Sequence, residues 1–310
     1  MGPDLFNIYI RSLKKYIKSS CFKIFGFADD HQLLKTFLPL LQVYALDGDI
    51  NNCFRLITEW MNMYFLKLNA GKTKILVVVP PSLKDKVLIQ GTFIDGKCIR
   101  FVQSAKNLGV ILDDELSFKE QIKYVVKSCF LSIRKLSSIK PFLTFQQLRT
   151  ATSSLVFSRI DYCNSLYYGL NETHLSKLQY VQNSAARLVR KRNHFHGSTE
   201  NVIRHCHWLR IKERIVFKIC LIVRKGLNGT APKCISDMLK EASSTRTGKL
   251  VVPSYLSKYG NRCFARAGPK LWNLLPFNIR AETDVAKFKK LLKTFLFDGF
   301  AGFEQKLKER

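Results

Sequence analysis

The hydrophobic pattern of this chain changes its period near residue 116, and that change sets the broad architecture. From Phe118 to Leu136 the apolar residues recur at every third or fourth position, which is the spacing of one face of an amphipathic helix. Before residue 116 the apolar residues form shorter runs separated by turn-forming residues, as the strands of a small sheet do. The sequence therefore predicts an α+β first region followed by an all-α region.

Within the first region, two short aromatic and aliphatic runs flank a pair of aspartates. The runs 21–28 and 31–37 read as strands, so Asp29 and Asp30 are expected at the tip of a hairpin. The pattern also predicts helices over 5–16 and 47–63, a buried strand at 75–79, a turn at 95–96 and a short strand with a turn over 107–113. These elements describe a small antiparallel α+β segment.

Helices dominate the prediction after residue 116. They are expected over 118–136, 146–159, 174–190, 208–227 and 284–297. Pro141 follows the first of them and breaks it, because proline cannot continue a helix. Residues 242–270 are polar and rich in turn-forming residues, and they predict a loop.

Positive charge is concentrated in the helical part of the chain. Residues 1–116 are nearly balanced, whereas residues 117–310 hold 36 Lys and Arg against 12 Asp and Glu, a net charge of +24. Such an excess favours a polyanionic partner, most often nucleic acid. The candidate binding side chains at helix ends and on helix faces are Arg187, Arg190, Lys191, Arg192, Arg210, Arg214 and Lys218. The alternative is that these residues form ordinary solvated helix faces.

The Asp29–Asp30 pair is the feature with the clearest chemical potential. Adjacent carboxylates repel one another, and a hard divalent cation such as Mg²⁺ relieves that repulsion while binding substrate phosphates. Small residues next to the pair, Gly26 and Ala28, would let a nucleic-acid end approach. The alternative is a solvated acidic turn, in which aspartates are common for local reasons.

The cysteines and histidines give weaker signals. The nine cysteines are scattered with no CxxC pair, which favours a reduced intracellular compartment, nucleus or cytoplasm, over a disulfide framework. One short stretch contains a cluster of possible zinc ligands, namely His194, His196, His205, Cys206 and His207. Their spacing does not match that of known zinc sites, so a zinc site is not expected. No apolar run approaches the length of a membrane span, so no membrane partner is expected.

An ordered set of motifs resembles the reverse transcriptases of non-LTR retrotransposons, of the LINE-type, jockey-like group. The segment Phe25–Asp30 looks like the acidic box of these enzymes, and Leu66–Thr73 resembles the motif that follows it. Further matching pieces are Gly2–Ile10, Asn107–Val110, Ser165–Leu170, His207–Leu209, Leu227–Pro232, Gly268–Pro276 and Phe288–Lys293. The resemblance covers essentially the whole chain.

The resemblance implies a role for each motif. Asp29 and Asp30 would be catalytic residues that hold Mg²⁺, and Lys72 would donate a proton to pyrophosphate. Phe27 and Ala28 would lie near the primer end, and Leu108 and Gly109 would shape a primer grip. The expected partners are an RNA template and a DNA primer, or their RNA–DNA hybrid. Residues 1–116 would be the last part of a polymerase palm, 117–192 a thumb-like helical domain and 193–310 a basic C-terminal region.

One departure from the family bears on activity. The metal site of these enzymes also takes a carboxylate from an earlier palm motif, which would lie upstream of Met1, as would the fingers. We therefore expect a fragment of an RNA-directed DNA polymerase that is inactive alone, because losing a principal electrostatic element of a site commonly lowers the rate by orders of magnitude. The alternatives are a non-enzymatic nucleic-acid-binding remnant, and a decayed reading frame whose partial palm is unstable.

Overall fold

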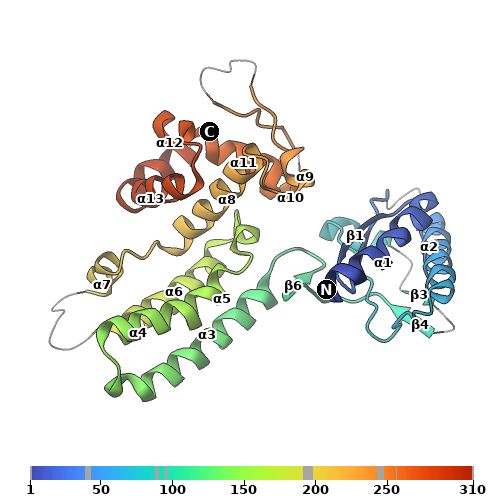
Figure 1. Cartoon of the computed structure of the whole chain (residues 1–310), viewed down its shortest axis with the longest axis horizontal. Helices are drawn as coiled ribbons and strands as arrows, with labels where there is room; N and C mark the ends of the chain where they lie inside the picture. Colours follow the sequence, from blue (N-terminus) through green and yellow to red (C-terminus); the bar gives the residue numbers. More distant parts are fainter. Residues whose placement is uncertain are drawn as a thin grey trace. The chain divides into compact units, whose positions relative to one another are not determined.

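In the computed structural model, helices form most of the chain and small antiparallel strand pairs lie in its first third (Figure 1). The structure describes residues 2–38, 43–87, 91–94, 97–190, 198–242, 248–255 and 257–308. Contacts divide the chain into two compact units, Met1–Gln121 and Ile122–Arg310. The protein is thus mixed α/β and largely helical.

The first unit combines two long helices with three strand pairs among its described residues. The helices are α1 (Gly2–Tyr16) and α2 (Val43–Met63), with the short 3₁₀ helices η1 (Ile17–Ser19) and η2 (Pro81–Lys86). The strands are β1 (Lys23–Phe27), β2 (Asp30–Leu34), β3 (Gly91–Ile94), β4 (Lys97–Arg100), β5 (Ser104–Asn107) and β6 (Val110–Asp113). They pair antiparallel as β1–β2, β3–β4 and β5–β6.

The core of this unit forms where α1, α2 and one face of the β1–β2 hairpin meet. Its buried residues are Leu13, Ile17, Cys53, Ile57 and Trp60, and Ile24 and Leu33 of the hairpin pack against them. The indole Nε1 of Trp60 donates to Ser12 Oγ at 3.1 Å, which ties α2 to α1. Burial of these apolar side chains supplies the main stabilisation and fixes which face of the hairpin points inward.

The chain leaves the first unit through a turn that a single carboxylate organises. Asp113, at the end of β6, accepts backbone N–H bonds from Ser117 at 2.7 Å and from Phe118 at 2.6 Å. Both bonds are charge-assisted, and they stabilise the left-handed backbone of Phe118, whose φ is 56°. Helix α3 (Lys119–Ile139) begins directly afterwards.

The second unit is helical wherever the structure describes regular elements apart from one isolated bridge. Its longer helices are α3, α6 (Glu172–Val189), α8 (Ile211–Leu227) and α13 (Val285–Lys308). The shorter ones are η3 (Lys140–Phe142), α4 (Phe145–Thr152), η4 (Ser153–Phe157), α5 (Ser158–Asp161), η5 (Asn164–Tyr167), α7 (Thr199–His205), α9 (Lys233–Ser236), α10 (Lys258–Arg262), α11 (Phe264–Asn273) and α12 (Phe277–Ala281).

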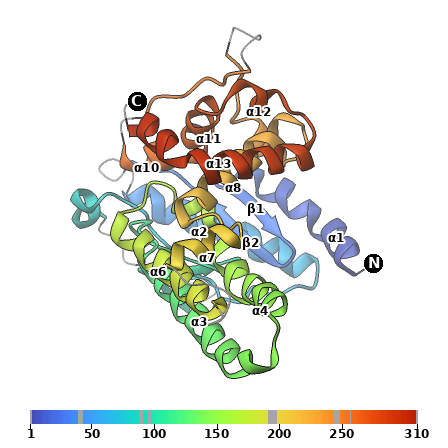
Figure 2. The same cartoon turned by 90° about the vertical axis from the view of Figure 1, so that its left-hand side faces the viewer.

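Helix α8 lies at the centre of this unit. It contacts α6, α9, α11 and α13, and Figure 2 shows α11, α12 and α13 gathered around it. Gly268 of α11 permits the close approach of α11 to α8, because a Cβ at that position would lie 3.0 Å from Val223 Cγ2. Helix α8 is therefore covered on more than one side, and it buries residues around much of its circumference.

A π-helical turn interrupts the helical run that follows η3. The segment η4 (Ser153–Phe157) lies between α4 and α5, and helical backbone continues from Phe145 to Asp161. Thr144 caps the start of this run through a capping box with Gln147. The turn buries Val156 and Phe157, and the Phe157 ring meets Trp208 edge-on at a centroid distance of 4.5 Å.

The predicted helices are all present, and most of their ends are shifted by a few residues. Helix α13 extends to Lys308, eleven residues beyond the predicted end, and the helix predicted over 146–159 contains the π-helical turn η4. The acidic pair lies at the hairpin tip as predicted. The predicted strand at 75–79 is wrong: Ile75 forms one isolated parallel bridge with Phe101, and no described strand continues alongside it. The predicted loop at 242–270 ends earlier than expected, since α10 and α11 begin within it. The predicted turn at 95–96 lies outside the described residues.

Among the helices of the described residues, none combines the length and the apolar character of a membrane-spanning segment.

Candidate nucleic-acid interface

The acidic hairpin turns through Ala28 and Asp29, between the paired residues Phe27 and Asp30. Ala28 has a φ of 52°, a left-handed conformation that a residue with a Cβ adopts at a cost of about 1 kcal/mol. A two-residue connection is among the commonest links between the strands of a β-hairpin. The turn therefore holds the acidic pair in a tight, defined bend.

The two faces of the hairpin differ in character. Ile24 and Leu33 lie opposite one another and both point into the core, so the residues next to them along each strand point outward. The outward face carries Phe25, which is 47% exposed, and Phe27, which is 69% exposed. Asp30 lies directly across from Phe27 on this face. Two exposed aromatic rings therefore lead up to the acidic turn.

The carboxylates of Asp29 and Asp30 are exposed, and neither forms an ion pair with a described residue. The ring nitrogen Nδ1 of His31 lies 3.0 Å from the backbone oxygen of Asp29, which leaves the Asp29 carboxylate untouched. Both carboxylates are consequently available to a cation.

The donor set fits one class of metal site and not another. Mg²⁺ shared with substrate phosphates needs only one or two protein carboxylates, which this turn provides. A closed protein site needs more, and the described residues contain no group of three His, Cys, Asp or Glu side chains that could hold a metal ion. In particular, none of the described carboxylates joins Asp29 and Asp30 as a third ligand.

Lys72 lies in a separate, asparagine-capped turn. Its backbone N–H donates to Asn69 O and Asn69 Oδ1, both at 3.1 Å, and its side chain is exposed. No ion pair joins Lys72 to Asp29 or Asp30 in the described part of the chain. The structure therefore does not bring Lys72 into direct contact with the acidic pair.

Leu108 and Gly109 form the two-residue turn of the β5–β6 hairpin, a strand pair distinct from the acidic one. Their φ values are 45° and 84°, and two successive positive values are the signature of a type I′ turn. Such turns favour Asn, Asp or Gly at the first position, so a half-exposed leucine there is unusual. Strained positions of this kind are often retained for function.

The predicted phosphate-binding residues of the second unit fall into two groups. Arg187, at the end of α6, is exposed, with its guanidinium carbon 5.5 Å from the centroid of the exposed Tyr180 ring. Arg190 follows it and is also exposed, and the half-buried Lys218 forms no ion pair with a described residue. Lys191 and Arg192, like His194 and His196, lie outside the described residues.

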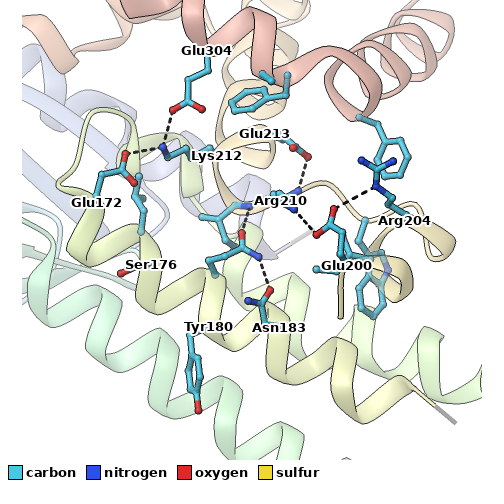
Figure 3. A pocket seen from close by; sticks show the side chains of 18 of the residues that line it. Glu172, Ser176, Tyr180, Asn183, Glu200, Arg204, Arg210, Lys212, Glu213 and Glu304 are labelled. Atoms are coloured by element: carbon cyan, nitrogen blue, oxygen red, sulfur yellow. Dashed lines mark hydrogen bonds and ion pairs between the residues drawn. The ribbon is translucent and has the colours of Figure 1, made fainter. Parts of the chain in front are cut away.

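Arg210 and Arg214 instead form ion pairs with acidic residues of the same unit. Arg210 forms an ion pair with Glu200, shown in Figure 3. Arg214 is 13% exposed, and its Nη1 donates to Asp161 Oδ2 at 2.7 Å. Its guanidinium carbon also lies 4.4 Å from the Phe157 ring centroid. The expectation that Arg214 lies on a solvated basic face is therefore wrong, because neighbouring helices cover that part of α8.

The same helix carries a buried arginine, Arg224, that the sequence pattern does not predict. Arg224 is 5% exposed, and its guanidinium carbon lies 4.7 Å from the Trp272 ring centroid and 5.2 Å from that of Phe288. Burial lowers the pKa of Arg224. The apolar spacing of α8 gave no sign of this contact, because Trp272 and Phe288 belong to distant segments.

Comparison of the chain with protein-family models, with curated proteins and with solved structures finds no match in any of the three.

Proposed function

We propose that this chain carries the acidic palm hairpin and the basic thumb and tail of a LINE-type reverse transcriptase. One observation carries the proposal: the exposed ring of Phe27 lies next to two carboxylates that have no ion-pair partner among the described residues. Adjacent carboxylates repel one another unless a cation binds them, and the exposed rings of Phe25 and Phe27 on one face of the hairpin offer a stacking surface. A nucleic-acid end with its phosphates and a bound cation would satisfy both.

Each part of the hairpin has a distinct task in this proposal. Phe27, with Phe25 behind it, stacks against a base or sugar, an interaction worth about 1–3 kcal/mol per base in comparable sites. Ala28 keeps the turn small enough for that approach. Asp29 and Asp30 would hold Mg²⁺, which neutralises and orients the phosphates of the bound strand. The proton donation by Lys72 rests on the resemblance alone.

The same site is incomplete as a catalyst. Its acidic ligands number two, and the described residues offer no third. Phosphodiester formation by two metal ions requires a cage that positions both the attacking and the leaving oxygen. We therefore infer that the chain by itself binds an RNA–DNA hybrid and does not extend the primer.

Binding and primer extension on the same hybrid test this proposal. The purified chain should bind a fluorescent RNA–DNA hybrid more tightly when Mg²⁺ is added, and should add no nucleotides. Asp29→Asn should abolish the gain from Mg²⁺, and Phe27→Ala should weaken binding about tenfold, by analogy with other stacking sites.

Matched controls separate these effects from general changes. Phe93 is also 69% exposed and lies on a different hairpin, so Phe93→Ala should leave binding unchanged. Asp85 is an exposed aspartate of η2, so Asp85→Asn should keep the Mg²⁺ dependence. If the wild-type chain extended the primer and Asp29→Ala abolished this extension, the claim that the catalytic site is incomplete would be refuted.

A second candidate function is nucleic-acid binding by the helical part alone. The net charge of +24 on residues 117–310 and the exposed Arg187 next to Tyr180 favour it. Binding would then fall steeply with salt, and Arg187→Ala would lower the salt slope on single strands by about 0.7. Binding that follows Arg187 and ignores Asp29 and Phe27 would select this second function.

A further inference from the structure

The second unit contains a groove of about 690 Å³ that the proposed function does not use (Figure 3). Parts of α6, α7, the start of α8 and the end of α13 form its walls. Its apolar lining includes Leu175, Ile203, Trp208, Ile211, Phe297 and Phe300. A volume of this size accommodates several side chains of a bound partner.

The charge of the groove is opposite to that of the unit around it. Five of the twelve acidic residues of 117–310 line the groove, namely Glu172, Glu200, Glu213, Asp298 and Glu304. Only three of the 36 basic residues do so: Arg204, Arg210 and Lys212. The lining is therefore net acidic within a region of net charge +24.

Ion pairs engage all three basic residues of the groove and leave its lining with a net negative charge. Lys212 Nζ lies 2.8 Å from Glu172 Oε1 and 2.8 Å from Glu304 Oε1, so one cation serves two carboxylates from α6 and α13. Glu200 pairs with both Arg204 and Arg210. Asp298 is exposed at the edge and forms no ion pair with a described residue.

These contacts also set the shape of the groove. Lys212 links α8 to α6 and to α13, and Glu213 accepts the backbone N–H of Arg210 at 2.7 Å. Gln179 Oε1 accepts the N–H of Ile211 at 3.2 Å, and Gln179 Nε2 donates to Asn183 Oδ1 at 2.9 Å. Because the walls are connected in this way, a partner meets a preformed surface.

We propose that this groove docks a cationic, amphipathic peptide segment of a protein partner. The apolar lining would take its leucine or phenylalanine side chains, and the leftover negative charge at Asp298 and around Lys212 would attract its lysines or arginines. The same charge repels phosphates, so nucleic acid would occupy other surfaces of the unit. Peptide and nucleic acid would then bind the chain at the same time.

Fluorescence anisotropy with two model peptides tests this proposal on the full chain. One is a labelled amphipathic peptide of leucine and lysine, and the other has glutamate in place of every lysine. The lysine peptide should bind, and the glutamate peptide should not compete with it. Asp298→Lys should weaken binding about fivefold, the effect of one reversed charge at a partly exposed site.

Asp237→Lys is the matched control, because Asp237 is an exposed aspartate at the end of α9 and does not line the groove. It should leave binding of the lysine peptide unchanged. Phe300→Ala should weaken binding by removing part of the apolar lining, which separates docking from simple charge attraction.

Three results would overturn the proposal. The first is that the wild type and Asp298→Lys bind the lysine peptide equally well. The second is that the RNA–DNA hybrid displaces the bound lysine peptide, and the third is that the chain forms a dimer that Asp298→Lys dissociates. The last would assign the groove to a second copy. Each of these outcomes leaves the test of Asp29 and Phe27 untouched.

Discussion

Arg214 Nη1 donates to Asp161 Oδ2 at 2.7 Å, joining residues that lie 53 positions apart in the sequence. The same guanidinium donates through Nε to Leu209 O at 2.7 Å and covers the ring of Phe157. Arg214 thus connects α8 to α5 and to the π-helical turn η4. Its positive charge is used inside the unit and is not available to phosphates.

Replacing Arg214 should destabilise the fold without a specific loss of nucleic-acid affinity. Arg214→Ala removes a charge-assisted hydrogen bond and the ion-pair partner of Asp161, which keeps only its hydrogen bond from Asn164. We expect the free energy of unfolding in urea to fall by about 2 kcal/mol. Arg187→Ala, at an exposed site, should change it by less than about 0.5 kcal/mol. If Arg214→Ala instead preserved stability and reduced hybrid binding, its role would be at the interface.

Leu108→Asn should stabilise the protein. Leu108 occupies a left-handed position next to Gly109, and asparagine adopts that conformation more readily than leucine. We expect a gain of about 0.5–1 kcal/mol in unfolding free energy, measured by urea denaturation. Leu131→Asn makes the same change at a half-exposed position inside α3 and should lower stability, since asparagine is the poorer helix former.

Arg224 tests what a buried cation contributes when aromatic rings enclose it. Its Nη2 donates to Arg280 O, whereas its Nε is buried with no hydrogen-bond partner in the described structure. Arg224→Ala should lower the free energy of unfolding by about 3 kcal/mol, because it leaves a cavity against Trp272 and Phe288. Arg224→Met fills that space without burying a charge and should lose less than half as much. Equal losses would show that the guanidinium, and not its volume, is required.

The environment of Glu213 predicts that the stability of the protein changes with pH in a defined direction. Burial raises the pKa of Glu213 above its ordinary value, although Arg210 opposes the shift. A carboxyl group whose pKa is higher in the folded than in the unfolded protein contributes its full stabilisation at pH values below the unfolded-state pKa. That contribution is lost as the pH rises through the folded-state pKa. Wild type should therefore lose stability relative to Glu213→Gln as the pH rises above the ordinary carboxyl pKa of 4.5, in urea denaturation at several pH values. A constant difference over this range would contradict the shift.

The acidic hairpin was predictable because its signals are local. The short aromatic and aliphatic runs at 21–28 and 31–37 and the polar pair between them identify the turn, and the pairing of Phe27 with Asp30 agrees with that prediction. The apolar run at 75–79 wrongly predicted a strand, because a strand depends on a distant partner. The sequence of Ile75 and its neighbours does not show whether a second strand lies alongside them.

Helix α8 shows where periodicity fails for side chains. The spacing of Ile211, Ile215 and Ile219 predicts one buried face and an opposite solvated face. In the structure Val223 and Arg224 are buried as well, because α6, α11 and α13 cover the helix from several directions. Arg214 packs against α5 and η4, and Arg224 packs against α11 and α13. These segments are distant in the sequence, so the spacing within α8 predicted the wrong environment for Arg214 and gave no sign that Arg224 is buried.

The π-helical turn Ser153–Phe157 holds about one residue more than an α-helical turn, within a helical run that continues from α4 into α5. An α-helix completes a turn in about 3.6 residues, so a π-helical turn accommodates an added residue with little change in the direction of the residues that follow. A single-residue deletion within 153–157 that restored regular α-helix would therefore leave Asp161 directed towards Arg214 and keep that ion pair. A deletion that left the π-helical turn in place would instead rotate Asp161 by about 100° and break it. The turn thus makes this segment tolerant of losing one residue.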